Sequence, residues 1–288
     1  MQNFSSTELL TYANLQIAAE ALYGKLKSPA GNPNVLMSAK EISDINNGLT
    51  ATKPEDGYLT FGNKHTSKFS QTQAEQFKQE WQVVQHINNT KTGFSGTLFK
   101  NTKGELVLSF RSTEFIEDYI HDNIATNTYE IFKTGWAWGQ IADMEEWFSS
   151  LKTAGLIPDN QQITVTGYSL GGHLATAFHI LHQHDELIKI YENPKLIKNT
   201  LTFNGAGVGS MGGDDITTDE ELRNAINNFS NCHKNGVGHL LTGKVANFSV
   251  ADFYNKIRTS LKEVLDSIGN NTDISQYIVE LEKLYSYC

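Results

Sequence analysis

Residues 162–182 read QITVTGYSLGGHLATAFHILH, and this stretch decides how the rest of the chain is interpreted. Its first part, Gln162–Gly167, is short and rich in β-branched residues, which is typical of a strand. Residues 170–184 have the apolar spacing of a helix. Between them, Gly167–Gly171 (GYSLG) forms a G-x-S-x-G pattern. The sequence therefore predicts a strand, a tight turn and a helix in immediate succession.

The glycines of this pattern have a mechanical purpose. A tight turn strains the backbone of Ser169, and a side chain at Gly167 or Gly171 would collide with the neighbouring strand or helix. The serine hydroxyl would project from the carboxyl edge of the sheet, where ligands bind in open α/β sheets. The N-terminus of the helix directs its N–H groups to the same place. With these flanks, the pattern predicts a nucleophilic serine.

Strands that alternate with helices along the chain predict an α/β fold with a mainly parallel central sheet flanked by helices. A capping box at residues 5–8 predicts a first helix over residues 7–26. Residues 28–70 are rich in Gly, Asn, Ser, Thr and Pro and are expected to be irregular. The other expected elements are a helix at 72–80, a strand at 81–87, a hairpin of 94–99 and 105–110, a helix at 136–154, a strand at 200–203 and two helices within 252–286. We expect one domain over residues 1–288, with 1–70 as a helical and irregular lead-in.

Composition and charge exclude several classes of function. The 288 residues carry a net charge of −9, and no Lys/Arg run is present, so a nucleic-acid partner is not expected. No apolar run is long enough for a transmembrane segment. The first residues lack a signal-peptide pattern, so we expect a cytoplasmic protein, export by a signal-independent route, or a chain shown without its signal. The two cysteines, Cys232 and Cys288, form no metal or redox motif.

Three blocks of sequence carry a resemblance to a known family. Residues 165–175 (VTGYSLGGHLA) resemble the turn around the nucleophile in class 3 lipases, which include fungal triacylglycerol lipases and bacterial lipases and phospholipases. Residues 107–113 (VLSFRST) resemble that family's strand ending in Phe-Arg-Gly-Ser/Thr, with Ser112 in place of the glycine. Residues 202–209 (TFNGAGVG) resemble its strand and Gly-rich loop after the nucleophile helix, without the proline often found there.

The resemblance implies an α/β-hydrolase fold and a carboxylester hydrolase that acts on acyl esters of lipids. Ser169 would attack the ester carbonyl and form an acyl-enzyme, a mechanism that needs no cofactor or metal. The backbone N–H of Leu170 and the side chain of Thr113 would form the oxyanion hole. Asp122 follows Arg111 at the family's spacing, and we expect an ion pair between them that fixes the intervening loop; two separate surface charges are the alternative. A phospholipase A1 and a catalytically inert hydrolase-fold binding protein are the alternatives.

The segment after Thr113 indicates which kind of substrate the protein binds. Residues 114–124 place Ile116, Tyr119, Ile120 and Ile124 on one face of a helix. In class 3 lipases the segment at this place is a lid over the site, so the resemblance implies a lipid or small ester substrate and transient contact with a lipid interface. A fixed core helix is the alternative.

The acid and the histidine of the triad are not evident from the order Ser…Asp/Glu…His. Asp252 follows the apolar residues 245–250, but no histidine comes after His239, and Asp252 serves equally well as a helix N-cap. A second interpretation keeps the order at very short spacing and pairs Asp214, Asp215 or Asp219 with His233 or His239. The third, which we favour, is that the chain is a fragment and continues beyond Cys288. His239 is the best candidate within the chain.

Other titratable clusters are expected to be structural. His179, His182 and His184 lie on one predicted helix without a carboxylate or cysteine at ligand spacing, and we expect them to be solvated. His173 is expected to pack or to cap rather than to react. The carboxylates of residues 143, 145 and 146 are expected on a solvated helix face.

Overall fold

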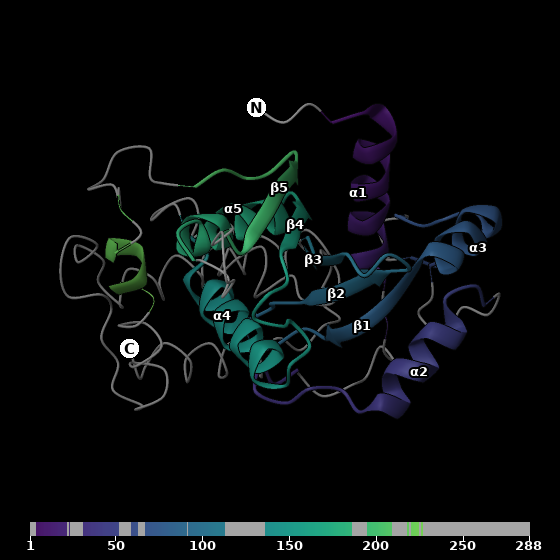
Figure 1. Ribbon diagram of the computed structural model, residues 1–288, viewed down its shortest axis with the longest axis horizontal. Helices are drawn as coiled ribbons and strands as arrows, with labels where there is room; N and C mark the ends of the chain where they lie inside the picture. The colour runs from purple at the N-terminus through teal and green to yellow at the C-terminus, as the bar shows by residue number, and fades with distance from the viewer. Residues whose placement is uncertain are drawn as a thin grey trace, which may run out of the picture.

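A single sheet organises the part of the chain that the structure describes. The computed structural model describes residues 4–21, 23, 31–51, 59–62, 67–90, 92–112, 136–185, 195–208, 218, 220–224 and 226. Its five-stranded sheet has the order β1-β2-β3-β4-β5, so neighbours in the sheet are also neighbours in sequence (Figure 1). The strands are β1 (Trp81–Ile87), β2 (Gly96–Asn101), β3 (Leu106–Phe110), β4 (Ile163–Tyr168) and β5 (Ile197–Phe203).

The sheet is mixed. β1 pairs with β2 and β2 with β3 in antiparallel fashion, whereas β3 pairs with β4 and β4 with β5 in parallel. The α/β character and the hairpin of β2 and β3 are confirmed, but the expectation of a mainly parallel sheet is wrong. The links at residues 88–95 and 102–105 are too short for the crossover that a parallel pair requires. The longer links after β3 and β4 contain helices and therefore permit parallel pairing.

Helices cover both faces of the sheet. They are α1 (Ser6–Ala19), α2 (Ala39–Gly48), α3 (Gln71–Glu80), α4 (Trp138–Thr153) and α5 (Leu170–His182). Successive residues of a strand point to opposite faces, so on β3 Val107 packs with residues of α1, α2 and α3, and Leu108 packs with residues of α4 and α5. The result is a three-layer arrangement with the sheet in the middle (Figure 1).

Two expectations for the N-terminal region are corrected. The first helix has the predicted capping box but ends at Ala19, earlier than expected, because the chain turns and the Tyr23 hydroxyl donates to the Ala18 carbonyl at 2.7 Å. The region 28–70 contains the helix α2, which was not expected. Its start is a second capping box, in which Ser38 and Glu41 bind each other's backbone N–H groups.

Several predicted features lie outside the described residues. They are Thr113, the segment 114–124 with Asp122, the histidines His233 and His239, the acid candidates Asp214, Asp215, Asp219 and Asp252, the helices within 252–286, and both cysteines. In the described ranges, no helix combines the length and apolar character needed to cross a membrane.

Candidate active site

The backbone of Ser169 adopts a strained conformation at the turn between β4 and α5. Its φ is 51° and its ψ is −116°, and residues with a Cβ rarely adopt a positive φ. Three backbone hydrogen bonds of 3.1 Å hold the strained residue: its N–H donates to Phe203, and its carbonyl accepts from His173 and Ala206. Such strain persists only where the surrounding structure enforces it, and it occurs frequently at functional sites.

The glycines around Ser169 allow backbone segments to approach very closely. A Cβ on Gly167 would lie 2.1 Å from the Gly171 carbonyl oxygen, and a Cβ on Gly171 would lie 2.2 Å from the oxygen of Phe110. A Cβ on Gly172 would lie 2.7 Å from the Cα of Gly205. The expectation that side chains at Gly167 and Gly171 would collide with a neighbouring strand or helix is confirmed. The ends of β3 and β5 therefore lie directly against the first turn of α5.

The hydroxyl of Ser169 is not used to cap the helix. A serine at this position normally accepts a hydrogen bond from the first turn of the helix, but the Ser169 side chain makes no such bond. Ser169 is half-buried, while Gly167 and Leu170 beside it are buried and Tyr168 is 42% exposed. Leu170 is the first helical residue, so its N–H has no partner within the helix. A hydroxyl and a backbone donor are thus adjacent at a partly open position.

The end of β3 is held by buried polar contacts. Arg111 is 6% exposed, and its Nη2 donates to Asn89 Oδ1 at 2.6 Å. Ser112, the residue that departs from the family pattern, donates its backbone N–H and its hydroxyl to the carboxylate of Glu20 at 3.0 and 2.8 Å. Sequence reasoning missed Glu20, because no local pattern links residues 92 positions apart. The predicted partner of Arg111, Asp122, lies outside the described residues.

His173 is a packing residue, as expected from the sequence. It is fully buried on α5, its Nε2 accepts the N–H of Ala137 at 3.1 Å, and its Nδ1 donates to the carbonyl of Gly207. Burial lowers the pKa of His173 to about 4, against the opposing effect of the bond to Gly207. Both ring nitrogens are occupied, so His173 has no free nitrogen with which to take a proton from Ser169.

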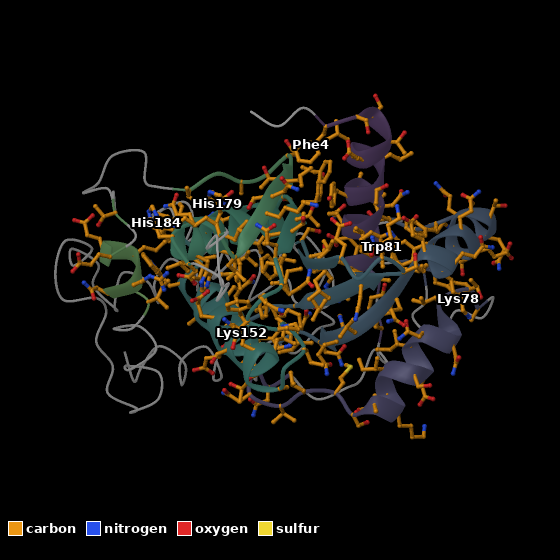
Figure 2. The ribbon with its side chains drawn as sticks, in the orientation of Figure 1. Phe4, Lys78, Trp81, Lys152, His179 and His184 are labelled. Atoms are coloured by element: carbon orange, nitrogen blue, oxygen red, sulfur yellow. The ribbon has the colours of Figure 1, made fainter. Side chains whose placement is uncertain are left out.

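Three other described histidines follow Ser169: His179 and His182 lie in the last turn of α5, and His184 lies just beyond it (His179 and His184 are labelled in Figure 2). His179 makes a hydrogen bond to Thr200 at 3.0 Å. His182 lies 13 positions from Ser169, which is about 20 Å along a helix. His179, 10 positions from Ser169, lies about 15 Å along the same helix, and His184 follows the end of that helix, so none of these three histidines can act on Ser169.

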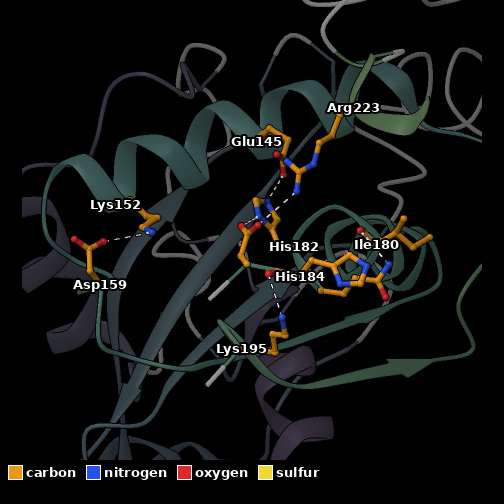
Figure 3. A network of polar contacts seen from close by, with 10 residues as sticks. Glu145, Lys152, Asp159, Ile180, His182, His184, Lys195 and Arg223 are labelled. Atoms are coloured by element: carbon orange, nitrogen blue, oxygen red, sulfur yellow. Dashed lines mark hydrogen bonds and ion pairs between the residues drawn. The ribbon is translucent and has the colours of Figure 1, made fainter. Parts of the chain in front are cut away.

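His182 is not solvated, which corrects the sequence-based expectation. It is 6% exposed, and its Nδ1 and Nε2 contact Asp185 at 2.6 Å and Glu145 at 3.0 Å (Figure 3). Burial opposes the charged form of His182, but its hydrogen bonds to the two carboxylates outweigh burial and raise its pKa. Arg223 approaches Asp185 at 3.6 Å. The cluster joins α4 to the end of α5.

The carboxylates of α4 are also engaged rather than forming a plain solvated face. Asp143 accepts from the Thr92 hydroxyl at 2.6 Å, and Glu146 accepts from Asn34 Nδ2 at 2.8 Å. Together with the Glu145 contact to His182, these bonds fasten α4 to the preceding and following segments. Among the described residues there is no group of three or more His, Cys, Asp or Glu side chains that could hold a metal ion.

Comparisons of the chain with protein families, with curated proteins and with solved structures gave no match. What the site can do chemically follows from its geometry and from the sequence blocks around it. That geometry offers a hydroxyl at a strained turn, a helix N-terminus beside it and a buried framework that fixes both. Such an arrangement is suited to nucleophilic attack on a carbonyl with stabilisation of the resulting oxyanion.

Proposed function

We propose that this protein is a serine carboxylester hydrolase that acts on acyl esters of lipids, with Ser169 as its nucleophile. The observation that carries the proposal is the strained backbone of Ser169 combined with a hydroxyl that makes no capping bond. A serine that served only the fold would gain stability from a relaxed backbone and a capping bond. The strained backbone of Ser169 lowers the stability of the fold, and we infer that it is retained because it presents the hydroxyl as a nucleophile.

In this proposal Ser169 attacks the ester carbonyl while its proton passes to a histidine, which then protonates the departing alcohol as the ester C–O bond breaks. Water hydrolyses the resulting acyl-enzyme and releases the acid. The N–H of Leu170 is one oxyanion donor, and Thr113 is proposed as the second. The base is proposed to be a histidine outside the described residues, with His239 as the candidate. The occupied nitrogens of His173 and the remote position of His182 support this assignment.

A fluorophosphonate probe and a short-chain p-nitrophenyl ester test the proposal. Wild-type protein is expected to be labelled and to hydrolyse the ester, and Ser169→Ala to lose both properties, because removal of a triad member costs roughly 10⁴–10⁶ in rate. Ser149→Ala is the matched control, since Ser149 is an exposed serine on α4. Equal activity of Ser169→Ala and wild type would refute the assignment. Emulsified triacylglycerol and phosphatidylcholine vesicles, offered separately, distinguish a lipase from a phospholipase A1.

A catalytically inert binding protein is the second candidate. It is favoured by one observation, that the ring nitrogens of the described residues His173 and His182 are engaged in structural contacts. Under this alternative, wild-type protein neither reacts with the probe nor hydrolyses any ester, although it retains its fold.

A further inference from the structure

The carboxylate of Glu20 forms a buried contact between the N-terminal helix and the end of β3. Glu20 follows the last residue of α1 and is 2% exposed. It accepts hydrogen bonds from the backbone N–H of Ser112 at 3.0 Å, from the Ser112 hydroxyl at 2.8 Å and from Gln16 Nε2 at 2.6 Å. The two carboxylate oxygens share these donors: Oε1 accepts from the Ser112 N–H, and Oε2 accepts from the Ser112 hydroxyl. The bonds fix Ser112 in position and in orientation.

This placement of a carboxylate is unfavourable for stability by itself. Removing a carboxylate from water costs hydration energy, which its new hydrogen bonds must offset. The C-terminal end of a helix also carries partial negative charge, and no basic residue lies in the last turn of α1. An apolar side chain would close this end of α1 without either cost. A carboxylate, however, can bind both the backbone N–H and the hydroxyl of Ser112, which an apolar side chain cannot do.

The segment that Glu20 holds is adjacent to the candidate nucleophile. The ladder between β3 and β4 ends where Phe110 pairs with Gly167, so Ser112 lies beyond the last sheet pairing. The carbonyl oxygens of Phe110 and Arg111 would lie 2.2 and 3.0 Å from a Cβ on Gly171, in the first turn of α5. A displacement of this segment would therefore be transmitted directly to the helix N-terminus that begins beside Ser169.

We propose that Glu20 is a positioning residue that acts through Ser112 to hold the end of β3 against the first turn of α5. The inference rests on the proposed function, because it assigns Glu20 a role in the reaction of Ser169. Its effect is on the geometry in which the oxyanion forms, so it alters kcat more than KM. A second contact offers a control: at the other end of β3, the Tyr12 hydroxyl donates to Glu105 at 2.9 Å. That bond also ties α1 to the sheet, but far from Ser169.

The test compares the hydrolysis of p-nitrophenyl butyrate by wild-type protein and five variants, each checked for folding by circular dichroism. The variants are Glu20→Ala, Glu20→Gln, Ser112→Ala, Tyr12→Phe and the double variant Glu20→Ala/Ser112→Ala. Loss of about 1 Å of precision at a reacting centre costs on the order of 10²-fold in rate, so we expect Glu20→Ala to lower kcat by roughly 10–100-fold with KM nearly unchanged. Glu20→Gln keeps an oxygen acceptor and is expected to recover part of the loss. Tyr12→Phe is expected to retain the wild-type kcat. If Glu20 acts through Ser112, the double variant is no slower than Glu20→Ala.

The remaining outcomes separate the positioning role of Glu20 from the proposed hydrolase function. A wild-type kcat in folded Glu20→Ala, an equal loss in Tyr12→Phe, or additive losses in the double variant would overturn the positioning role while leaving the hydrolase intact. Wild-type protein without labelling or hydrolysis would overturn the proposed function, and this role with it. If Glu20→Ala does not fold, Ser112→Ala decides the matter, since it removes only the hydroxyl bond. Its kcat is then expected to fall with KM unchanged, and an unaltered kcat would refute the role.

Discussion

A methyl group at Gly171 is expected to damage both the stability and the activity of this protein. In Gly171→Ala the new Cβ would lie 2.2 Å from the carbonyl oxygen of Phe110, and that oxygen belongs to a strand held in the sheet. Reaching ordinary contact requires the first turn of α5 and the end of β3 to separate by about 1 Å. Overpacking of this kind costs ~1–3 kcal/mol. For a chain of this size, that free energy lowers Tm by about 2–12 °C.

The same displacement is expected to reduce kcat by on the order of 10²-fold, because it moves the N–H of Leu170 away from its position beside Ser169. Differential scanning fluorimetry and hydrolysis of p-nitrophenyl butyrate measure the two effects. Gly205→Ala is the matched control, since its Cβ would come no nearer than 3.4 Å to Gly172. A Gly171→Ala variant with the Tm and kcat of wild type would refute the close contact between β3 and α5.

Two further predictions concern buried histidines. The pKa of His173 is lowered to about 4, so the NMR signals of its ring should not titrate between about pH 8 and 5. The free energy of unfolding should fall by about 3 kcal/mol as pH decreases from about 6.5 towards 4, because the unfolded state binds the proton more readily than the folded state in that range. A titration midpoint of His173 near the ordinary histidine value would contradict this. The pKa of His182 is raised, so its contribution to stability is complete below about pH 6.5 and is lost as pH rises through the folded pKa. His182→Gln should therefore lower Tm more at about pH 6 than at about pH 9, and equal losses at both would count against a charged His182 held by Asp185 and Glu145.

Local sequence patterns predicted most of the regular elements in the described region. The strand at 81–87 and the turn between β2 and β3 follow from alternation and turn chemistry over a few residues. The helix α2 was missed even though Ser38 and Glu41 form a capping box like the one recognised at Ser5. The helix was missed because residues 28–70 were judged by their overall content of Gly, Asn and Pro. That content says nothing about the helical spacing of two apolar residues, Ile42 and Ile45, which pack in the core. The mixed sheet was missed because strand direction depends on which links contain a helix.

The turn at Ser169 could be predicted from the sequence because its causes are local: a β-branched strand, glycines without Cβ atoms and a helix that begins at once. The surroundings of that turn, in contrast, depend on contacts between residues far apart in the chain. The carboxylate of Glu20 meets Ser112 across 92 positions, and His182 meets Glu145 across 37, through contacts that no short-range period encodes. Packing also shifted the pKa values of two histidines: desolvation lowers that of His173, whereas hydrogen bonds to two carboxylates outweigh desolvation and raise that of His182.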